Sequence, residues 1–373
     1  MRVDYYKINK DFLRIKKNFF KKISNLGKNG DFILGSSVLK LENNLKKLLN
    51  VKYVVGVANG TDALELALLA TGIKPGDEVI TVSNSFVSTA NAILNVGAKP
   101  IFADIDNTFN INPDKIENLI TKKTFAIMPV HLNGLPCCMN KINKIKKKYK
   151  LKVIEDAAQS ILSVYDNKYT GTIGDVGCFS MHPTKNLGVI GDGGFVTTNN
   201  KIFYNKIISI RNHGLEKNQN VNLIGRNSRL DNIHAEYAAL RIKDLKKDIV
   251  IRNKIAEKYN SELSKYVKVP FLGCCKKVYH TYHRYVIMTK KRNKLFNYLR
   301  EKKIDVKIHY VKNIHELSAF KKISKNVNLP ITNQVSKEMI SLPCNHFMKK
   351  KEVDYVIKVI KNFFLKKKSL SSF

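Results

Sequence analysis

The chain of 373 residues contains few cysteines, and their spacing favours neither a structural metal nor a disulfide framework. Its six cysteines include two vicinal pairs, and no C-x-x-C motif is present. His280 and His283 follow the pair Cys274-Cys275, but vicinal cysteines do not adopt ordinary zinc-finger spacing. A chain of this length also does not depend on a disulfide scaffold. We therefore expect no metal site, reduced thiols and a cytoplasmic location.

Long hydrophobic runs are also absent. No stretch approaches the ~20 consecutive apolar residues that a membrane-spanning helix needs. Residues 1–22 carry charges throughout and lack the apolar core of a signal peptide. Hydrophobic residues still make up 44% of the chain, which is enough for a packed interior. We expect a soluble protein without a membrane partner.

Acidic residues are scarce beside basic ones, with 30 against 66 and a formal net charge of +36. Such an excess can attract nucleic acid. The lysines, however, are spread along the whole chain, without an arginine-rich arm or an aromatic-interleaved basic motif. We interpret the positive charge as that of lysines on a solvated surface, which would steer anionic substrates toward the protein. We expect no nucleic-acid partner. A basic nucleic-acid-binding protein is the alternative from another functional class.

Short apolar runs alternate with helical patterns from Tyr53 onward. The strand-like runs cover 53–57, 78–82, 101–105, 125–130 and 151–154. The helical patterns cover 62–71, 86–96 and 139–150, and a further helix is predicted to start at Asn112-Pro113. Strands that alternate with helices imply parallel pairing through right-handed crossovers. The expected fold class is therefore α/β, with a mainly parallel central sheet.

The two ends of the chain show different patterns. Residues 1–50 predict two helices separated by glycines, and residues 230–266 predict a long helix that leads into a second unit. That unit contains a strand at 282–288 and closes with an amphipathic helix at 351–364. We predict a large domain over 1–244, including the N-terminal helical segment, and a smaller α+β domain over 245–373.

Lys185 stands out among the many lysines because no charged residue surrounds it. An apolar run ends at Ser180, a turn with Pro183 follows, and Lys185 comes next. Another predicted strand ends at Asp156, and ligands of open α/β sheets bind beyond the carboxyl ends of strands. A desolvated lysine loses its proton readily, and a buried acid can pair with a protonated ring nitrogen. A surface lysine and a helix-capping aspartate are the ordinary alternatives.

Four further residues complete a set that suits pyridoxal phosphate, together with Ser180. Gly60 and Thr61 precede a helix whose free N–H groups and dipole can hold a phosphate, although an ordinary helix cap explains them equally well. Gln159 is placed to reach a ring hydroxyl, and Ser180 to add a hydroxyl to the phosphate. Phe86 can stack on the ring, although a core phenylalanine is the commoner case. The joint occurrence of these residues favours the coenzyme.

On these residues the chain resembles the sugar aminotransferases of the DegT/DnrJ/EryC1/StrS family, which have the aspartate-aminotransferase-like fold type I. The resemblance runs from about residue 25 to 365. Its matching segments are 58–64, 85–93, 155–160, 179–188, 191–194, 225–231 and Leu342-Pro343. The resemblance implies a pyridoxal-phosphate-dependent transaminase.

The resemblance also implies a role for each site residue. Lys185 would carry the coenzyme and then act as the base that moves the proton. Asp156 would hold the ring nitrogen, and Asn227 would reach the phosphate from a partner subunit, so a homodimer is implied. The remaining cofactor-binding residues would be Gly60, Thr61, Phe86, Gln159 and Ser180.

For the substrates, the resemblance implies L-glutamate as donor and a nucleotide-linked keto sugar as acceptor. A lysine rather than a histidine at position 185 favours transamination over dehydration. Segments 180–188 and 212–214 resemble the branch that aminates C3 of 3-keto-6-deoxyhexoses in deoxysugar biosynthesis, including that of lipopolysaccharide or O-antigen sugars. His182 and His309 are candidates for the sugar pocket, with structural histidines as the alternative. Two rival interpretations are a C4 aminotransferase and a regulatory protein that binds the coenzyme without turnover.

Overall fold

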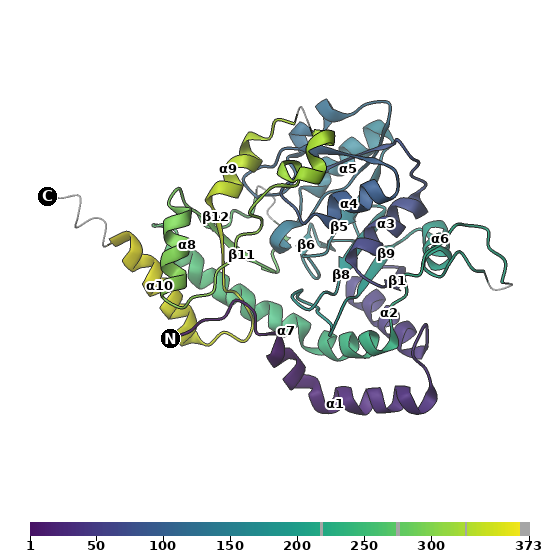
Figure 1. Ribbon diagram of the computed structural model, residues 1–373, viewed down its shortest axis with the longest axis horizontal. Coiled ribbons are helices and arrows are strands. Elements are labelled where there is room, and N and C mark those ends of the chain that lie inside the picture. The colour runs from purple at the N-terminus through teal and green to yellow at the C-terminus, as the bar shows by residue number, and fades with distance from the viewer. Residues whose placement is uncertain (217–218, 274–276, 325–326, 366–373) are drawn as a thin grey trace.

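The computed structural model describes residues 1–216, 219–273, 277–324 and 327–365, and its centre is a seven-stranded sheet (Figure 1). The strand order is β1-β9-β8-β5-β4-β2-β3. The strands are β1 (Tyr53–Val57), β2 (Glu78–Val82), β3 (Lys99–Ala103), β4 (Thr124–Ile127), β5 (Lys152–Asp156), β8 (Val176–Ser180) and β9 (Gly194–Thr198). β9 runs antiparallel to both of its neighbours, β1 and β8, and the other strand pairs of this sheet are parallel. The predicted α/β class with a mainly parallel sheet is confirmed.

Helices cover this sheet on both sides, and one of them is almost entirely buried. They are α3 (Gly60–Thr71), α4 (Ser88–Asn95), α5 (Met139–Tyr149) and α6 (Lys201–Arg211). The sequence of α3 is alanine- and leucine-rich on every face, which is the pattern of a helix surrounded by protein. It packs against β5, β8 and β9 as well as α4 and α6. Its first turn is thereby fixed at the carboxyl ends of the strands.

The N-terminal helices α1 (Ile8–Asn29) and α2 (Ser36–Leu49) confirm the two helices expected over 1–50. Both pack against α7 (Asn232–Leu263), which runs below the sheet in Figure 1. Ile15, Phe19 and Leu26 form the buried stripe of α1 at helical spacing. The helix ends at Gly30, whose φ of 63° supplies the left-handed cap.

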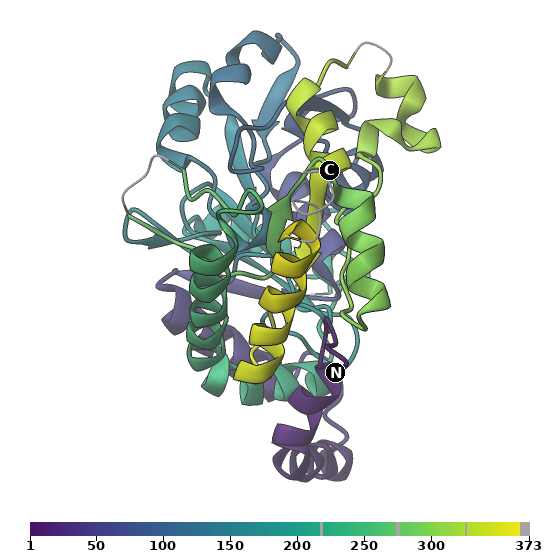
Figure 2. The same ribbon diagram turned by 90° about the vertical axis from the view of Figure 1, so that its left-hand side faces the viewer.

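The C-terminal part of the chain builds a separate core on α7. Its antiparallel pair β11 (Tyr285–Met288) and β12 (Met339–Leu342) is covered by α8 (Arg292–Glu301) and α10 (Lys350–Leu365), and Figure 2 shows α7 and α10 on this side. The core draws on residues from 255 onward and on Val3. The predicted boundary after residue 244 falls inside the continuous α7, and the domain division stays a prediction.

The smaller elements connect these units. The short strands β6 (Val164–Tyr165), β7 (Lys168–Tyr169) and β10 (Val278–Tyr279) form a three-stranded sheet, and α9 (Pro330–Glu338) precedes β12. The short 3₁₀ helices are η1 (Pro113–Lys115), η2 (Glu117–Leu119), η3 (Leu132–Gly134), η4 (Ile314–Glu316) and η5 (Ser318–Ser324). Within the described ranges, no helix has the length and apolar character needed to cross a membrane.

The helix predicted to start at Asn112-Pro113 is present as a short 3₁₀ helix and not as an α-helix. The side chain of Asn112 does cap the segment, by accepting a hydrogen bond from the N–H of Asp114 at 3.0 Å. Only the two short turns η1 and η2 follow, because the backbone turns extended at Ile120 to enter β4 at Thr124. The cap and the proline do start a helical turn, but the connection is too short for an α-helix.

Candidate active site

A cavity of about 650 Å³ opens where the strands of the large sheet end. Asp156 is the last residue of β5, Ser180 is the last residue of β8, and Gly60 begins α3 directly after β1. This is the place where open α/β sheets bind ligands, and its volume suits a small-molecule site. The cavity is lined by eight of the predicted residues: Gly60, Thr61, Phe86, Asp156, Gln159, Ser180, His182 and Lys185.

Lys185 is held in the turn that follows β8. Its backbone N–H donates to the carbonyl of His182 at 2.9 Å, which closes the turn around Pro183. Burial lowers the pKa of the Lys185 ammonium to about 7; the neighbouring guanidinium of Arg284 contributes to this decrease, while Asp156 acts in the opposite direction. Near neutral pH a large fraction of this amine is therefore unprotonated, as a base or nucleophile requires.

Asp156 is buried and accepts hydrogen bonds without forming an ion pair in the described part of the chain. Its Oδ2 accepts from the Thr89 hydroxyl at 2.8 Å, and its Oδ1 accepts from the Ala158 N–H at 3.2 Å. Burial raises the pKa of this carboxyl, and the hydrogen bonds and Lys185 only partly offset the rise. A cationic ring nitrogen placed against Asp156 would supply the missing counter-charge.

The start of α3 forms a cradle with room for an anion. The Oδ1 of Asn59 accepts from the Asp62 N–H at 2.9 Å and caps the helix. A Cβ on Gly60 would lie 2.6 Å from the Cβ of Ser180, so a side chain at position 60 would collide with β8. The Thr61 hydroxyl lies 3.0 Å from the Ser88 hydroxyl on α4. Hydroxyls and the first N–H groups of a helix together suit a phosphate.

Gln159 and Phe86 complete the wall of the cavity. The Oε1 of Gln159 accepts a hydrogen bond from the Asn133 N–H at 2.9 Å. This contact orients the side-chain amide, so that its NH₂ group is available to donate to a ligand. Phe86 is 55% exposed although it is aromatic, and its ring lies 6.0 Å from that of Tyr310. An exposed aromatic ring at the wall of a cavity suits stacking on a flat ligand.

The remaining predicted residues lie differently. His309 is not among the residues that line the cavity: its Nδ1 hydrogen-bonds with the Ser341 hydroxyl at 2.9 Å, and burial, together with nearby cations, lowers its pKa to about 2. Asn227 is exposed and pairs with Asn212 outside the cavity of its own chain. The substrate roles of His182 and His309 and the phosphate role of Asn227 stay predictions.

Thr89, Arg284 and Tyr310 are among the cavity residues that sequence reasoning did not assign to the site. Thr89 lies within the matching segment 85–93, and its contact with Asp156 was not foreseen. Arg284 and Tyr310 reach the cavity from the C-terminal part of the chain. A signal for Arg284 existed, because it is the one arginine or lysine in the strand-like run 282–288.

The cysteine pair Cys274-Cys275, considered for a metal site with His280 and His283, lies outside the described residues. His280 is buried, and this burial lowers its pKa to about 3. Its Nδ1 accepts from the N–H of Tyr282 at 2.9 Å, so the ring has a structural contact. His283 is also buried, and burial lowers its pKa.

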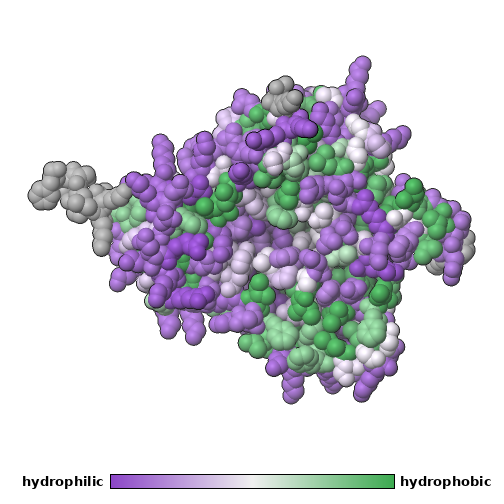
Figure 3. Space-filling view, in the orientation of Figure 1, coloured by the Kyte–Doolittle hydropathy of each residue, from purple (hydrophilic) through white to green (hydrophobic). Residues whose placement is uncertain are grey.

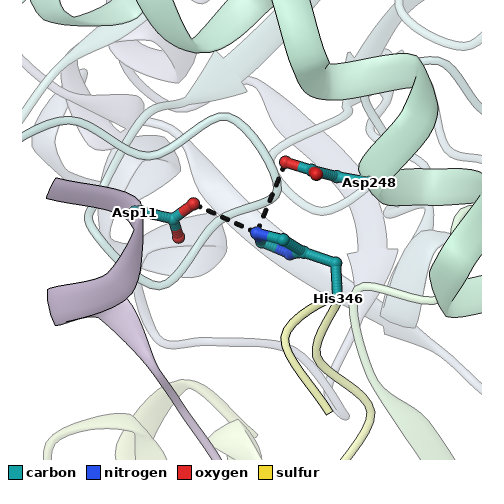
Figure 4. Close-up of side chains that lie close together, drawn as sticks. All are labelled: Asp11, Asp248 and His346. Carbon is teal, nitrogen blue, oxygen red and sulfur yellow. Dashed lines mark hydrogen bonds and ion pairs between the residues drawn. The ribbon is translucent and has the colours of Figure 1, made fainter. Parts of the chain in front are cut away.

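A second polar cluster lies away from the cavity and joins α1, α7 and the segment before α10 (Figure 4). We call Asp11, Arg14, Arg241, Asp248 and His346 the α1–α7 junction. Both Asp248 oxygens accept from Arg14, at 2.8 and 2.7 Å, and Arg241 pairs with Asp11. His346 Nε2 lies 3.0 Å from Asp11 and 3.3 Å from Asp248. Because arginines already neutralise both carboxylates, the cluster is an ionic junction and not a ready cation site.

Comparison with known proteins identifies relatives along nearly the whole chain. Residues 13–361 match the model of the DegT/DnrJ/EryC1/StrS aminotransferase family. A pleiotropic regulatory protein from Geobacillus stearothermophilus is 36% identical over 369 residues, 98% of this chain and 99% of that protein. A dTDP-3-amino-3,6-dideoxy-alpha-D-galactopyranose transaminase from Aneurinibacillus thermoaerophilus is 37% identical over 353 residues, 94% of this chain and 96% of that protein.

Solved structures give the same result. NtdA from Bacillus subtilis with bound cofactor PMP superimposes with a TM-score of 0.90 and 31% identity, covering 97% of this chain and 85% of that chain. The names of further relatives include UDP-sugar, GDP-sugar and dTDP-sugar enzymes, and one names glutamate as a reactant.

Proposed function

Because this chain belongs to the DegT/DnrJ/EryC1/StrS aminotransferase family, it is a pyridoxal-phosphate-dependent sugar aminotransferase, and we propose which donor and acceptor it uses. The donor is L-glutamate, and the acceptor is C3 of a nucleotide-linked keto sugar, a dTDP-3-keto-6-deoxyhexose. A transaminase function is supported above all by one observation: Lys185 and Asp156 share a cavity. The pKa of Lys185 is lowered to about 7, and Asp156 has no ion-pair partner among the described residues.

The choice of C3 and of dTDP is supported by the relative from Aneurinibacillus thermoaerophilus and by segments 180–188 and 212–214. The use of glutamate is supported by the relative whose name includes it. The alternative is a C4 aminotransferase acting on a UDP-, dTDP- or GDP-4-keto-6-deoxyhexose. A GDP-perosamine synthase among the relatives is the reason to retain this alternative, whereas the UDP-sugar relative is named for a 3-oxo substrate.

The residues of the cavity fit the coenzyme, which when bound supplies an electron sink beside the reacting carbon. Asp156 would keep the ring nitrogen protonated, because a cation there relieves the cost of burying this carboxylate. Gln159 would donate its NH₂ to the ring hydroxyl, and Phe86 would cover one face of the ring. The phosphate would be held by Gly60, Thr61 and Ser180, with Asn227 added from a partner subunit.

The work of the chain itself is proton transfer by the Nζ of Lys185. In the first half-reaction Nζ takes a proton from the α-carbon of glutamate, which leaves as 2-oxoglutarate. In the second half-reaction Nζ delivers a proton to the sugar carbon that receives the amine. A base with a pKa of about 7 can both take and return a proton near neutral pH, and both steps need this.

We also propose a homodimer in which the cavity is shared. Apolar residues lie exposed on the chain, among them Phe32, Ile33, Leu39 and Ile224, the last with 97% of its surface accessible. Figure 3 shows apolar surface in the lower part of the molecule, where Figure 1 places α1 and α2. A second copy of the chain would cover such surface and bring its Asn227 toward the cavity.

Mixing two inactive variants tests the shared cavity. Lys185→Ala and Asn227→Ala proteins are unfolded together, refolded as mixed dimers and assayed. If Asn227 serves the partner's cavity, one cavity of each mixed dimer carries both changes and the other carries neither, so activity returns. If no activity returns although mixed dimers form, each cavity is built from one chain.

The function is tested by following the absorbance of the coenzyme in purified protein. L-glutamate should convert the aldehyde form to the amine form, and each candidate keto sugar is then added to the amine form. The sugar that restores the aldehyde form identifies the acceptor, and the position of the amine in the product separates C3 from C4. A protein that binds the coenzyme but does not respond to glutamate would be regulatory, and the proposal would fail.

A further inference from the structure

Arg284 is a buried cation at the cavity wall that the reaction described above does not use. It precedes β11, is 8% exposed and lines the same cavity as Lys185. Its Nη1 donates to the Tyr310 hydroxyl at 3.1 Å, and its guanidinium lies 5.2 Å from the centre of the Tyr310 ring. Its Nε has no hydrogen-bond partner in the described part of the chain. One edge of the guanidinium is therefore left without a protein acceptor.

Among the described residues, no Asp or Glu lies within ion-pair distance of Arg284. Its charge instead lowers the pKa of its neighbours Lys185, His283 and His309. Burying a guanidinium without a counter-charge is costly, and the arrangement also works against protonation of Lys185. A bound anion would relieve both costs.

Other buried arginines of the chain show how the fold treats this side chain elsewhere. Arg211 pairs with Glu42 at 2.8 Å and donates to the carbonyl of Gly56 at 2.7 Å. Arg252 donates to the backbone carbonyls of Tyr282 and Cys344. Arg284 differs from both because its neighbours are aromatic rings and the open cavity.

We propose that Arg284 binds a carboxylate of a substrate inside the cavity. The proposal rests on the donor and acceptor proposed above and adds the recognition of an acidic group. The planar fork of an arginine matches a carboxylate through two parallel N–H···O hydrogen bonds. Asp156 shares the cavity but does not pair with Arg284, which leaves this fork for a ligand.

Two substrates could bring this carboxylate. One is the amino donor, whose carboxylate lies next to the carbon from which Lys185 takes a proton. The other is an acidic keto sugar that carries a carboxylate in place of the methyl group of a 6-deoxyhexose. Both place an anion close to the amine of Lys185, and titration with each substrate separates them.

The test compares the wild type with Arg284→Gln, Arg284→Lys and Tyr310→Phe. Arg284→Gln removes the charge, Arg284→Lys keeps the charge without the fork, and Tyr310→Phe keeps Arg284 but removes the hydroxyl that accepts from it. Coenzyme absorbance is titrated with L-glutamate on the aldehyde form. On the amine form it is titrated with 2-oxoglutarate, a neutral keto sugar and a keto sugar bearing a carboxylate. Thermal unfolding of each variant checks that the protein is folded.

We expect Arg284→Gln to raise the dissociation constant of the carboxylate-bearing substrate about 10²-fold, with an intermediate loss for Arg284→Lys. Binding of the neutral sugar should be unchanged. Loss confined to glutamate and 2-oxoglutarate assigns the carboxylate to the donor, and loss confined to the acidic sugar assigns it to the acceptor.

The proposal is overturned if folded Arg284→Gln protein binds all of these substrates as the wild type does. A wild type that does not respond to glutamate would instead refute the proposed amino donor. Titration with succinate, a dicarboxylate that cannot react, gives a readout that does not need turnover. Succinate should perturb the absorbance of the wild type at lower concentration than that of Arg284→Gln, and equal curves would count against a carboxylate site.

Discussion

Asp156 and Asp248 are both buried aspartates, yet their pKa values move in opposite directions. Burial raises the pKa of Asp156, whose hydrogen bonds come from a hydroxyl and a backbone N–H. Burial acts on Asp248 in the same sense, but the hydrogen bonds from Arg14, together with the charges around them, outweigh it and hold the pKa of Asp248 below its usual range. The difference lies in the partners and not in the burial.

The cations of the two regions show the same contrast. Arg14 and Arg241 in the α1–α7 junction each pair with an aspartate, so that the junction satisfies its own charges. Lys185 and Arg284 in the cavity have no acidic partner within the described residues. A buried charge without a partner of opposite charge in the chain lowers stability, and it therefore indicates a ligand-binding site. Buried charges that are paired within the chain instead hold its segments together.

The largest expected effect is on activity in the cavity. Lys185→Ala should lower the rate of amino transfer by at least roughly 10²–10⁴-fold, because it removes the amine that moves the proton. The free energy of unfolding should change little, because the residue removed is a cation without an acidic partner. Single-turnover absorbance and urea unfolding measure the two quantities, with the exposed Lys321→Ala as control. Retained amino transfer in Lys185→Ala would show that this buried lysine is not the base of the reaction.

The next effect is on stability at the α1–α7 junction. Asp248→Ala removes the carboxylate that pairs with Arg14 and lies 3.7 Å from Arg241, and it should cost up to about 3–5 kcal/mol of unfolding free energy although Asp11 still pairs with both arginines. Asp156→Ala in the coenzyme-free protein should cost far less, because this carboxylate has no ion pair to lose. Urea unfolding of both variants makes the comparison. Similar losses at the two positions would show that burial and not pairing governs these aspartates.

A steric change in the phosphate cradle should have a smaller effect. Gly60→Ala places a Cβ 2.6 Å from the Cβ of Ser180 and should cost about 1–3 kcal/mol through overpacking, and it should also weaken coenzyme binding. The double variant Gly60→Ala with Ser180→Gly removes the clash and should recover stability without full recovery of coenzyme affinity. Urea unfolding and coenzyme titration measure the two. Full recovery of both would mean that the Ser180 hydroxyl does not contribute to the cradle.

The smallest effect concerns the pH dependence of stability. Burial, together with the charge of Arg252, lowers the pKa of His346 to about 3, from 6.5 in the unfolded chain. Between these pH values His346 is protonated in the unfolded chain and neutral in the folded protein. The free energy of unfolding therefore falls as the pH falls from 6.5 toward 3. The slope is at most about 1.4 kcal/mol per pH unit. Urea unfolding across this range measures it. His346→Gln should remove this component, and the exposed His213→Gln should not.

Much of the fold follows from local patterns. The strands β1 and β2 have the bounds expected from their apolar runs, and α7 and α10 begin and end within about three residues of theirs. Strand β3 begins and ends two residues before the expected run at 101–105, because pairing with β2 sets its bounds. Strand-to-strand pairing is not visible in a single stretch of sequence.

The candidate site was foreseen where its residues stand at strand ends, whereas Arg284 and Tyr310 were missed because they come from the C-terminal part of the chain. Asp156, Ser180 and Lys185 carry local signals, since each stands at or just after an apolar run. Arg284 and Tyr310 reach the same cavity only because the C-terminal part of the chain packs beside the large sheet. No spacing rule connects residues that lie so far apart in the sequence.

The amino-acid order alone determined the alternation of strands and helices and the polar residues that follow the strands, because side-chain periodicity and turn chemistry act over a few residues. The tertiary structure decided which charges are buried and which of these find a partner. The reason is physical: the cost of a buried charge depends on the groups packed around it, and those groups come from distant parts of the chain.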